Sequence, residues 1–320
     1  MVVVCFLMQS FRPSITWSLC ANLPIEVSIG TSIVVNGKVY FGGGVTSEED
    51  ECKVYCYDPL KDEWSALSSV NTRRFSLGRI NDKLVAVGGT KKRPSRERTN
   101  ELFTFNENTG KWKKTYPAMP TARSSTLVFS LDSALIVAGG YSHTGEKTVT
   151  ENVVEVFKVM ESQWYTSSKL PLQRINMSGV VLHGNVYIMG GIRVGINHNE
   201  VVRASVDDLC DIVAANQTTQ TGSTSPWKIL PDTPTSKTAM TMLAGSLITL
   251  GGEENSYSKG NIIHMYSPST NSWINVGTIP APRVLTTVSG LSSTEIIMIG
   301  GFNSTENVNT VYKGTLQLTT

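Results

Sequence analysis

The sequence predicts an all-β fold: a six-bladed β-propeller whose blades are four-stranded antiparallel sheets. Two features that recur at intervals of about 50 residues carry this prediction. Glycine pairs end six short apolar runs, at Gly42/Gly43, Gly88/Gly89, Gly139/Gly140, Gly190/Gly191, Gly251/Gly252 and Gly300/Gly301. The six tryptophans of the 320-residue chain keep the same period, at Trp17, Trp64, Trp112, Trp164, Trp227 and Trp273. Repeats of this length with glycine and aromatic marks are typical of propeller blades.

The first complete repeat contains four predicted strands, here called a to d in chain order. Strands a (31–35) and b (38–41) flank Asn36-Gly37, a strong hairpin signal because both turn residues tolerate positive φ. Strand c (54–57) follows a polar loop, and Trp64 opens strand d after a second turn. No single repeat can bury its own faces, so the blades are expected to stack around an axis. The glycines and tryptophans are therefore assigned structural roles, in close backbone approach and in packing between blades.

The two ends of the chain predict how the ring closes. Residues 310–316 supply a last strand c without a tryptophan strand after it, while Ser14–Leu19 forms a strand d without the other three. Together they complete one blade and remove an open sheet edge. We therefore assign residues 1–13 to a lead-in and residues 14–320 to the propeller. An insertion at about 207–226 in the fourth repeat begins with a possible helical turn and continues as a polar tract expected to be mobile.

Bulk composition excludes several functions. A net charge of +2, with 40% hydrophobic and 17% charged residues, gives no footprint for nucleic acid. The apolar start, residues 1–8, is too short for a membrane helix and lacks the basic flank of a signal peptide. The odd number of cysteines, five, is unlike a disulfide framework. We expect a cytoplasmic, monomeric propeller without a cofactor.

The repeats resemble the Kelch repeat, which joins a glycine pair, an aromatic strand, a turn containing Pro or Asn, and a tryptophan. The segments from Gly42-Gly43 through Tyr57-Asp58-Pro59 to Trp64, and from Gly251-Gly252 through Tyr266-Ser267-Pro268 to Trp273, carry the likeness. It covers about residues 14–318. The resemblance implies a six-bladed binding module, and many Kelch proteins recognise substrates for cullin ubiquitin ligases. Those adaptors carry BTB and BACK domains before the propeller, and the present sequence includes neither.

Strand order places the b–c loops and the d–a connections on one face of the ring, and the a–b and c–d turns on the other. Each d–a connection carries a charged residue 14 to 17 positions before the glycine pair: Glu26, Arg74, Arg123, Arg174, Lys237 and Arg283. A ring of five cations at a channel mouth would attract an anion, and arginine suits a carboxylate or phosphate. The Kelch resemblance implies that Arg74, Arg123, Arg174 and Arg283 receive acidic peptides, whereas Lys237 and Glu26 depart from the pattern. The alternative is that these arginines bind nearby carbonyls or carboxylates and only shape the connection.

Two b–c loops of opposite charge lie in neighbouring repeats. The first contains Glu48–Glu51, and the second contains the basic run from Lys91 to Arg98. Loops on a rigid scaffold are common sites of specificity. Alternatively, the two neighbouring loops neutralise each other, and a charge run is more often a solvated loop than a binding epitope.

The sequence favours binding over catalysis. The four histidines (His143, His183, His198 and His264) fall in different parts of different repeats, and Cys52 and Cys56 lack two further ligands for zinc. We therefore expect no metal site and no enzyme activity. The runner-up is a sialate mutarotase-like enzyme, in which the arginines hold a sugar carboxylate and Glu26 acts as acid or base. A third interpretation is an actin-binding scaffold. The preferred hypothesis is a protein-interaction module that binds an acidic segment on the b–c/d–a face.

Overall fold

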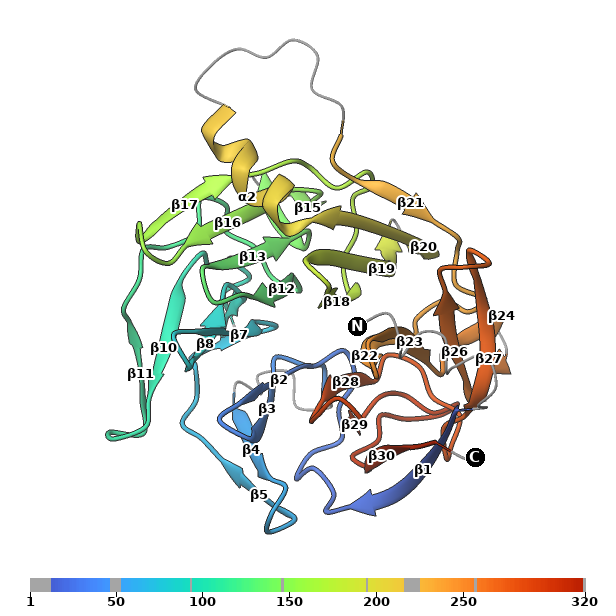
Figure 1. Ribbon diagram of the computed structural model, residues 1–320. Helices are drawn as coiled ribbons and strands as arrows, with labels where there is room; N and C mark the ends of the chain where they lie inside the picture. Colours follow the sequence, from blue (N-terminus) through green and yellow to red (C-terminus); the bar gives the residue numbers. More distant parts are fainter. Residues whose placement is uncertain are drawn as a thin grey trace.

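The computed structural model describes residues 13–46, 53–92, 94–144, 147–193, 195–215, 225–255 and 258–318. Within these ranges six four-stranded antiparallel sheets stand radially around a central axis, as Figure 1 shows along that axis. The predicted all-β, six-bladed propeller is confirmed. Strand a of each blade lies nearest the axis and strand d lies at the rim.

The blades are numbered in chain order, and their strands a to d have the following bounds. Blade 1 contains β2 (Thr31–Val35), β3 (Lys38–Gly42), β4 (Val54–Asp58) and β5 (Glu63–Ala66). Blade 2 contains β7 (Ser76–Ile80), β8 (Lys83–Val87), β10 (Leu102–Asn106) and β11 (Lys111–Lys114). Blade 3 contains β12 (Leu127–Ser130), β13 (Ala134–Ala138), β16 (Val154–Lys158) and β17 (Gln163–Thr166).

The remaining blades complete the ring. Blade 4 contains β18 (Ser178–Leu182), β19 (Asn185–Arg193), β20 (Ile196–Ser205) and β21 (Lys228–Leu230). Blade 5 contains β22 (Ala239–Leu243), β23 (Ser246–Leu250), β26 (Ile262–Ser267) and β27 (Ser272–Thr278). Blade 6 contains β28 (Thr287–Gly290), β29 (Glu295–Ile299), β30 (Val311–Leu318) and, from the start of the chain, β1 (Pro13–Cys20).

Three short two-stranded sheets flank the blades: the first joins a d–a connection to a b–c loop, and the other two lie within b–c loops. They pair β6 (Thr72–Arg73) with β9 (Thr90–Lys91), β14 (Tyr141–Thr144) with β15 (Lys147–Thr150), and β24 (Glu253–Asn255) with β25 (Ser258–Lys259). Bridges such as Ser124 to Tyr141 and Val284 to Phe302 join d–a connections to b–c loops. The two kinds of connection therefore share one face, as the strand order predicts. This face is called the b–c face below.

The hydrophobic core is divided into six clusters over the described residues, one between each pair of neighbouring blades. Five of the tryptophans donate their indole N–H to a backbone carbonyl near the outer strand of the preceding blade, as Trp64 does to Ala21 at 2.9 Å. Each of these side chains thus packs a blade and ties it to its neighbour. The structural role predicted for the tryptophans agrees with these contacts.

The ring closes in blade 6, where β1 pairs antiparallel with β30 from Pro13–Leu318 to Cys20–Val311. Figure 1 shows β1 at the rim beside β30. The predicted closure by an N-terminal strand is confirmed. Directly after β1, the backbone N–H of Ala21 donates to Asp62 Oδ1 at 2.8 Å, and the Tyr57 hydroxyl donates to the same oxygen at 2.7 Å. Blade 1 therefore fastens the end of the closing strand.

The Asp62 contacts predict an acid-sensitive closure. The N–H of Ala21, and then the Tyr57 hydroxyl, hold the pKa of Asp62 below its ordinary value. Because the folded-state pKa is depressed, this contribution is present above the unfolded-state pKa and is lost as pH falls through the folded one. We expect Asp62→Asn to flatten the dependence of Tm on pH below about pH 4, measured by circular dichroism. Asparagine suits this site because Asn271 accepts the Tyr266 hydroxyl at 2.8 Å in blade 5. An unchanged pH profile would contradict the assignment.

The insertion in blade 4 begins with helix α2 (Val206–Ala215), so the predicted helical turn is a longer helix. Ser205 caps it by accepting the N–H of Asp207 at 3.1 Å, and Leu209 is fully buried against blades 3 and 4. Figure 1 shows α2 beside the outer strands of these blades. The polar tract predicted to be mobile lies, for residues 216–224, outside the described residues.

The glycine pair of blade 1 is shifted by one residue from the predicted pair. Thr31 pairs with Gly42, whereas the corresponding residue Leu127 of blade 3 pairs with Ala138, before its glycines. Gly43 has the positive φ that the first glycine of each other pair adopts. The structural pair of blade 1 is therefore Gly43/Gly44. An extra glycine at the end of β3 hides this register in the sequence.

Candidate functional site

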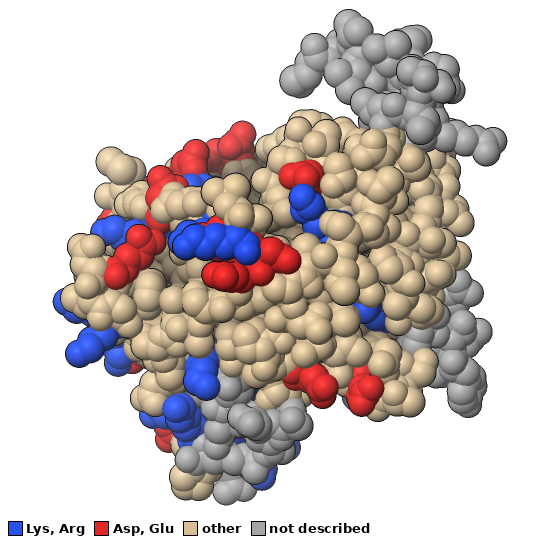
Figure 2. Space-filling view, turned by 90° about the horizontal axis from the view of Figure 1, so that it is seen from below, with Lys and Arg blue, Asp and Glu red and all other residues tan. Residues whose placement is uncertain are grey.

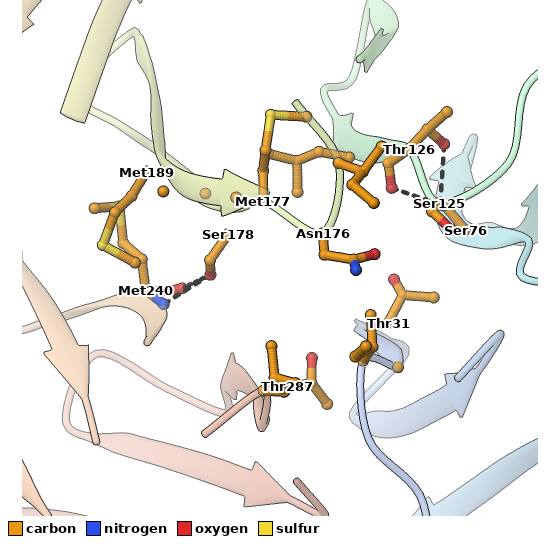
Figure 3. Close-up of a pocket in the computed structure, with 18 of the residues that line it drawn as sticks. Thr31, Ser76, Ser125, Thr126, Asn176, Met177, Ser178, Met189, Met240 and Thr287 are labelled. Carbon is orange, nitrogen blue, oxygen red and sulfur yellow. Dashed lines mark hydrogen bonds between the residues drawn. The ribbon is translucent and has the colours of Figure 1, made fainter. Parts of the chain in front are cut away.

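A central cavity of about 670 Å³ opens among the inner strands. Small hydroxyl side chains line the part formed by blades 1, 2, 3 and 6, including Thr31, Ser76, Thr126 and Thr287. Methionines line the part formed by blades 4 and 5: Met177, Met189 and Met240. Figure 3 shows these groups around the open space. The walls thus combine uncharged hydrogen-bonding groups with soft apolar ones.

One residue from each blade forms a ring around this cavity, called here the mouth ring. Its members are Ile29, Arg74, Ser125, Asn176, Lys237 and Leu285. All six have left-handed backbone geometry, with φ between 51° and 57°. Each stands one residue after the bridge that joins its d–a connection to the b–c loop. The mouth ring is therefore a repeated structural position whose side chains all line the cavity.

Backbone hydrogen bonds join three of the six neighbouring pairs of the mouth ring. The N–H of Ile29 donates to the carbonyl of Leu285, that of Leu285 to Lys237, and that of Ser125 to Arg74, each at 3.0 Å. The left-handed turn exposes these groups to the neighbouring blade, so the backbone geometry is required by the ring rather than by any one side chain. These backbone bonds therefore do not restrict which side chain faces the cavity at each position.

The mouth ring has two unlike halves. Ile29 and Leu285, from blades 1 and 6, are apolar neighbours. The other four blades contribute two cations and two uncharged polar groups, Ser125 and Asn176. Asn176 points its amide into the open space in Figure 3. A ligand at this mouth meets charge on one side and hydrocarbon on the other.

The six predicted site residues do not form one ring, because they occupy different structural positions. Only Arg74 and Lys237 belong to the mouth ring. Arg123, Arg174 and Arg283 lie two residues before it and are 0%, 1% and 3% exposed. Glu26 is exposed but does not line the cavity. The prediction that all six bind a partner stays a prediction. Of the six, Arg74 and Lys237 line the central cavity.

The three buried arginines bind groups of their own blade. Arg123 Nη1 donates to the carbonyls of Gly139 at 2.6 Å and Val153 at 3.0 Å. Arg174 Nη1 donates to Gly190 O at 3.0 Å, and Arg283 Nη1 to Gly300 O at 3.1 Å. Burial lowers the pKa of all three guanidinium groups. These contacts match the alternative in which the arginines shape the connection.

Arg123 also forms a fully buried ion pair. Its Nη2 lies 2.7 Å from Glu155 Oε2, and the two side chains are 0% and 1% exposed. The other oxygen of Glu155 accepts the Thr121 hydroxyl at 2.7 Å. A pair removed from water to this degree depends on every partner for its stability.

Thr72 and Thr235 take the position of the buried arginines in blades 2 and 5. The Thr235 hydroxyl donates to Gly251 O at 3.1 Å, which is the bond that an arginine makes elsewhere. In these two blades the cation instead stands two residues later, at Arg74 and Lys237. Counting back from the glycines therefore finds one cation in most connections without separating buried from cavity-lining positions.

A cluster of three arginines flanks the mouth at blade 2. Arg73 pairs with Thr90 across β6 and β9, and Thr90 bridges to Arg98, so three adjacent segments bring these side chains together with Arg74. Burial, and then the charges of Arg74 and Arg73, lower the pKa of Arg98. Among the described residues, no carboxylate lies within ion-pair distance of Arg74 or Arg98. Sequence reasoning missed Arg73 and the role of Arg98, which only the loop pairing reveals.

The basic loop is only partly available for binding. Lys91 pairs with Glu97 at 2.5 Å, whereas Arg96 is exposed. Arg96, Arg98 and His143 line a second cavity of about 590 Å³ between this loop and blade 3, together with Glu97 and Glu151. The acidic run Glu48–Glu51, the predicted counterpart of this loop, lies outside the described residues.

The opposite side of the mouth, at blades 4 and 5, is balanced in charge. Lys237 Nζ lies 2.7 Å from Glu253 Oε2, and His198 Nδ1 lies 3.2 Å from Glu200 Oε2. Lys237 is thus already paired with a carboxylate, unlike Arg74. Figure 2 shows a similar interleaving of basic and acidic side chains on one side of the molecule.

No group of three or more His, Cys, Asp and Glu side chains is placed to hold a metal ion in the part of the chain that the structure describes. None of the helices described there is long and apolar enough to cross a membrane.

The sequence matches a known family over most of its length. A family model described as the KLHDC2/KLHL20/DRC7 Kelch-repeats domain matches residues 29–210 and 74–301. The chain belongs to the Kelch-repeat family. A solved structure is also similar in shape: the chain in "Structure of YjhT" aligns with a TM-score of 0.74 at 17% identity, over 93% of this chain and 99% of that one. At that identity the likeness concerns the fold alone.

Curated relatives of this Kelch propeller are longer proteins. "Kelch repeat and BTB domain-containing protein 1" of camelpox virus is 22% identical over 247 residues, which cover 75% of this chain and 40% of that protein. "Kelch-like protein 40" of Xenopus tropicalis is 32% identical over 162 residues, which cover 48% of this chain and 26% of that protein. The chain therefore spans about two fifths or less of the length of these relatives.

Proposed function

We propose that this Kelch propeller is a non-enzymatic protein-interaction module that binds an acidic segment of a partner at the blade 2 side of the cavity mouth. The arginine cluster of Arg73, Arg74 and Arg98 is the observation that carries the proposal. Arg74 is exposed, lines the cavity and has no described carboxylate within ion-pair distance. A planar guanidinium in this setting suits a carboxylate through two parallel hydrogen bonds. Recognition of substrates for ubiquitin ligation, which the Kelch resemblance implies, is one use of such a module, and the relatives' names record a BTB domain beside their Kelch repeats.

The second cavity extends the same surface outward. A peptide lying from Arg74 across Arg98 reaches Arg96 and His143 without leaving the b–c face. Several cations along one path favour a segment with more than one acidic residue, and their attraction speeds association at low salt. Binding is therefore expected to weaken as ionic strength rises.

Binding is favoured over the mutarotase-like reaction because the acid or base and the arginines proposed for that reaction do not lie together at one cavity. Glu26 does not line the central cavity, and Arg123, Arg174 and Arg283 donate to groups inside their own blades. An acid or base must lie within hydrogen-bond reach of its substrate.

Charge reversal at two exposed arginines tests the proposed site. We expect Arg74→Glu with Arg96→Glu to weaken binding of a fluorescein-labelled, glutamate-rich nonapeptide pool at least tenfold, or about 1.4 kcal/mol, in fluorescence anisotropy. The matched control is Lys111→Glu with Lys113→Glu, which makes the same charge change at exposed positions on the rim strand β11. Equal losses in the two variants would indicate a general charge effect and contradict the site. No preference of the unmodified protein for the glutamate pool over a glutamine pool would contradict the function.

A further inference from the structure

We infer that the apolar half of the mouth ring, Ile29 and Leu285, is an anchor site for an apolar side chain next to the acidic residues of the bound segment. This inference rests on the proposed function, which it deepens by naming a second feature of the partner. The segment then carries a negative charge toward Arg74 and a hydrocarbon side chain toward blades 1 and 6. Acidity alone would not be enough for recognition.

Backbone strain is the first argument. Ile29 has φ 57° and Leu285 φ 54°. A bulky or β-branched residue is an outlier in this region, which asparagine and glycine adopt far more readily. The ring hydrogen bonds require the left-handed backbone but place no demand on the side chain. The fold alone would favour asparagine, the residue that occupies this position in blade 4 at Asn176.

Exposure is the second argument. Neither side chain is fully buried, and both line the central cavity. An apolar residue that is strained and also partly solvated gains little from core packing, in contrast to Val27, which is 1% exposed two residues earlier. Strained residues at a cavity are typical of sites shaped for a ligand.

Complementarity is the third argument and sets the occupant. The cavity of about 670 Å³ has room for a side chain that enters between Ile29 and Leu285. Arg74 stands in blade 2, directly beside blade 1, so an acidic residue and an apolar one in the same short segment can reach both subsites. Burial of the apolar side chain supplies affinity that an exposed ion pair alone rarely provides.

Peptide selection tests the inference. A displayed library of random nine-residue peptides is bound to the unmodified protein, to Ile29→Asn with Leu285→Asn, and to Arg74→Glu, and the retained peptides are sequenced. For the unmodified protein we expect enrichment of Asp or Glu together with Leu, Ile, Met or Phe at a fixed spacing. The double asparagine variant should keep the acidic preference and lose the apolar one. A selected peptide should bind it roughly tenfold more weakly.

Thermal stability supplies an independent readout. Because asparagine relieves strain at both positions, the double variant should melt at the same or a higher temperature, by about 2 °C. The matched control is Ala244→Asn, which relieves the same strain at φ 49° in the a–b turn of blade 5, on the opposite face. It should leave peptide selection unchanged.

The outcomes separate the two proposals. Acidic enrichment without an apolar preference would overturn the anchor site and leave the proposed function intact, as would an apolar preference that survives in the double variant. Absence of acidic enrichment with the unmodified protein would overturn the proposed function and, with it, the segment described here.

Discussion

Replacing Arg123 by methionine is expected to destabilise the propeller by about 3–5 kcal/mol. The substitution leaves the carboxylate of Glu155, which is 1% exposed, without its cation, and the carbonyls of Gly139 and Val153 without their donor. A buried charge or carbonyl that loses its partner bears the full cost of desolvation. Equilibrium unfolding in urea, followed by circular dichroism, measures the change.

Two further variants show whether the ion pair is the cause. Combining Arg123→Met with Glu155→Leu removes both charges, so it should recover a large part of the lost stability. Arg283→Met should cost less than Arg123→Met, because Arg283 donates to Thr310 Oγ1 at 2.7 Å rather than to a carboxylate. A loss below about 1 kcal/mol in the first variant, the size typical of an exposed ion pair, would contradict a structural role for this buried pair.

Substituting alanine for Gly88 is the second change with a large expected effect, at least about 3 kcal/mol. Gly88 has φ +62°, and a Cβ there would lie 2.3 Å from the carbonyl oxygen of Arg123 in the next blade. Neither backbone can move without separating blades 2 and 3. The added methyl group therefore meets both a conformational and a steric barrier.

Gly37→Ala is the matched control. Gly37 has a similar φ, +74°, but nothing lies within 4 Å of a Cβ built there. It should cost only the conformational part, about 1–2 kcal/mol. Similar losses for the two alanine variants in urea unfolding would mean that close approach between blades contributes little.

Most of the fold could be predicted from the sequence, because its signals are local and repeated. Turn chemistry at Asn36-Gly37 marks the a–b hairpin, and each tryptophan marks a strand d with its packing partner in the preceding blade. Helix α2 was predicted only as a turn, since its apolar residues pack on blades 3 and 4 and show no long periodic pattern. Tertiary packing stabilises such a short helix more than its own propensity does.

The candidate site could be predicted only in outline. The b–c face follows from strand order, yet a count along the chain cannot distinguish Arg123, buried within its blade, from Arg74, which lines the cavity two positions later in its repeat. The mouth ring gave no compositional signal because Ile29 and Leu285 are residues that left-handed geometry disfavours. Aligning the repeats on the structural glycine pair of blade 1, Gly43/Gly44, would have brought five of the six positions into register, each 14 residues before the first glycine, whereas Leu285 lies 15 residues before Gly300.

The pairing of β1 with β30 also determines how the ring responds to mechanical load. Pro13 lies opposite Leu318 and Cys20 opposite Val311, so the first residue of β1 and the last residue of β30 lie at the same end of the antiparallel pair. Tension applied through these ends separates the two strands one residue pair at a time, instead of shearing all eight pairs together. The closure then resists force through one residue pair at a time, and the hydrogen bond from Ala21 to Asp62 of blade 1 bears load only after all eight pairs have separated.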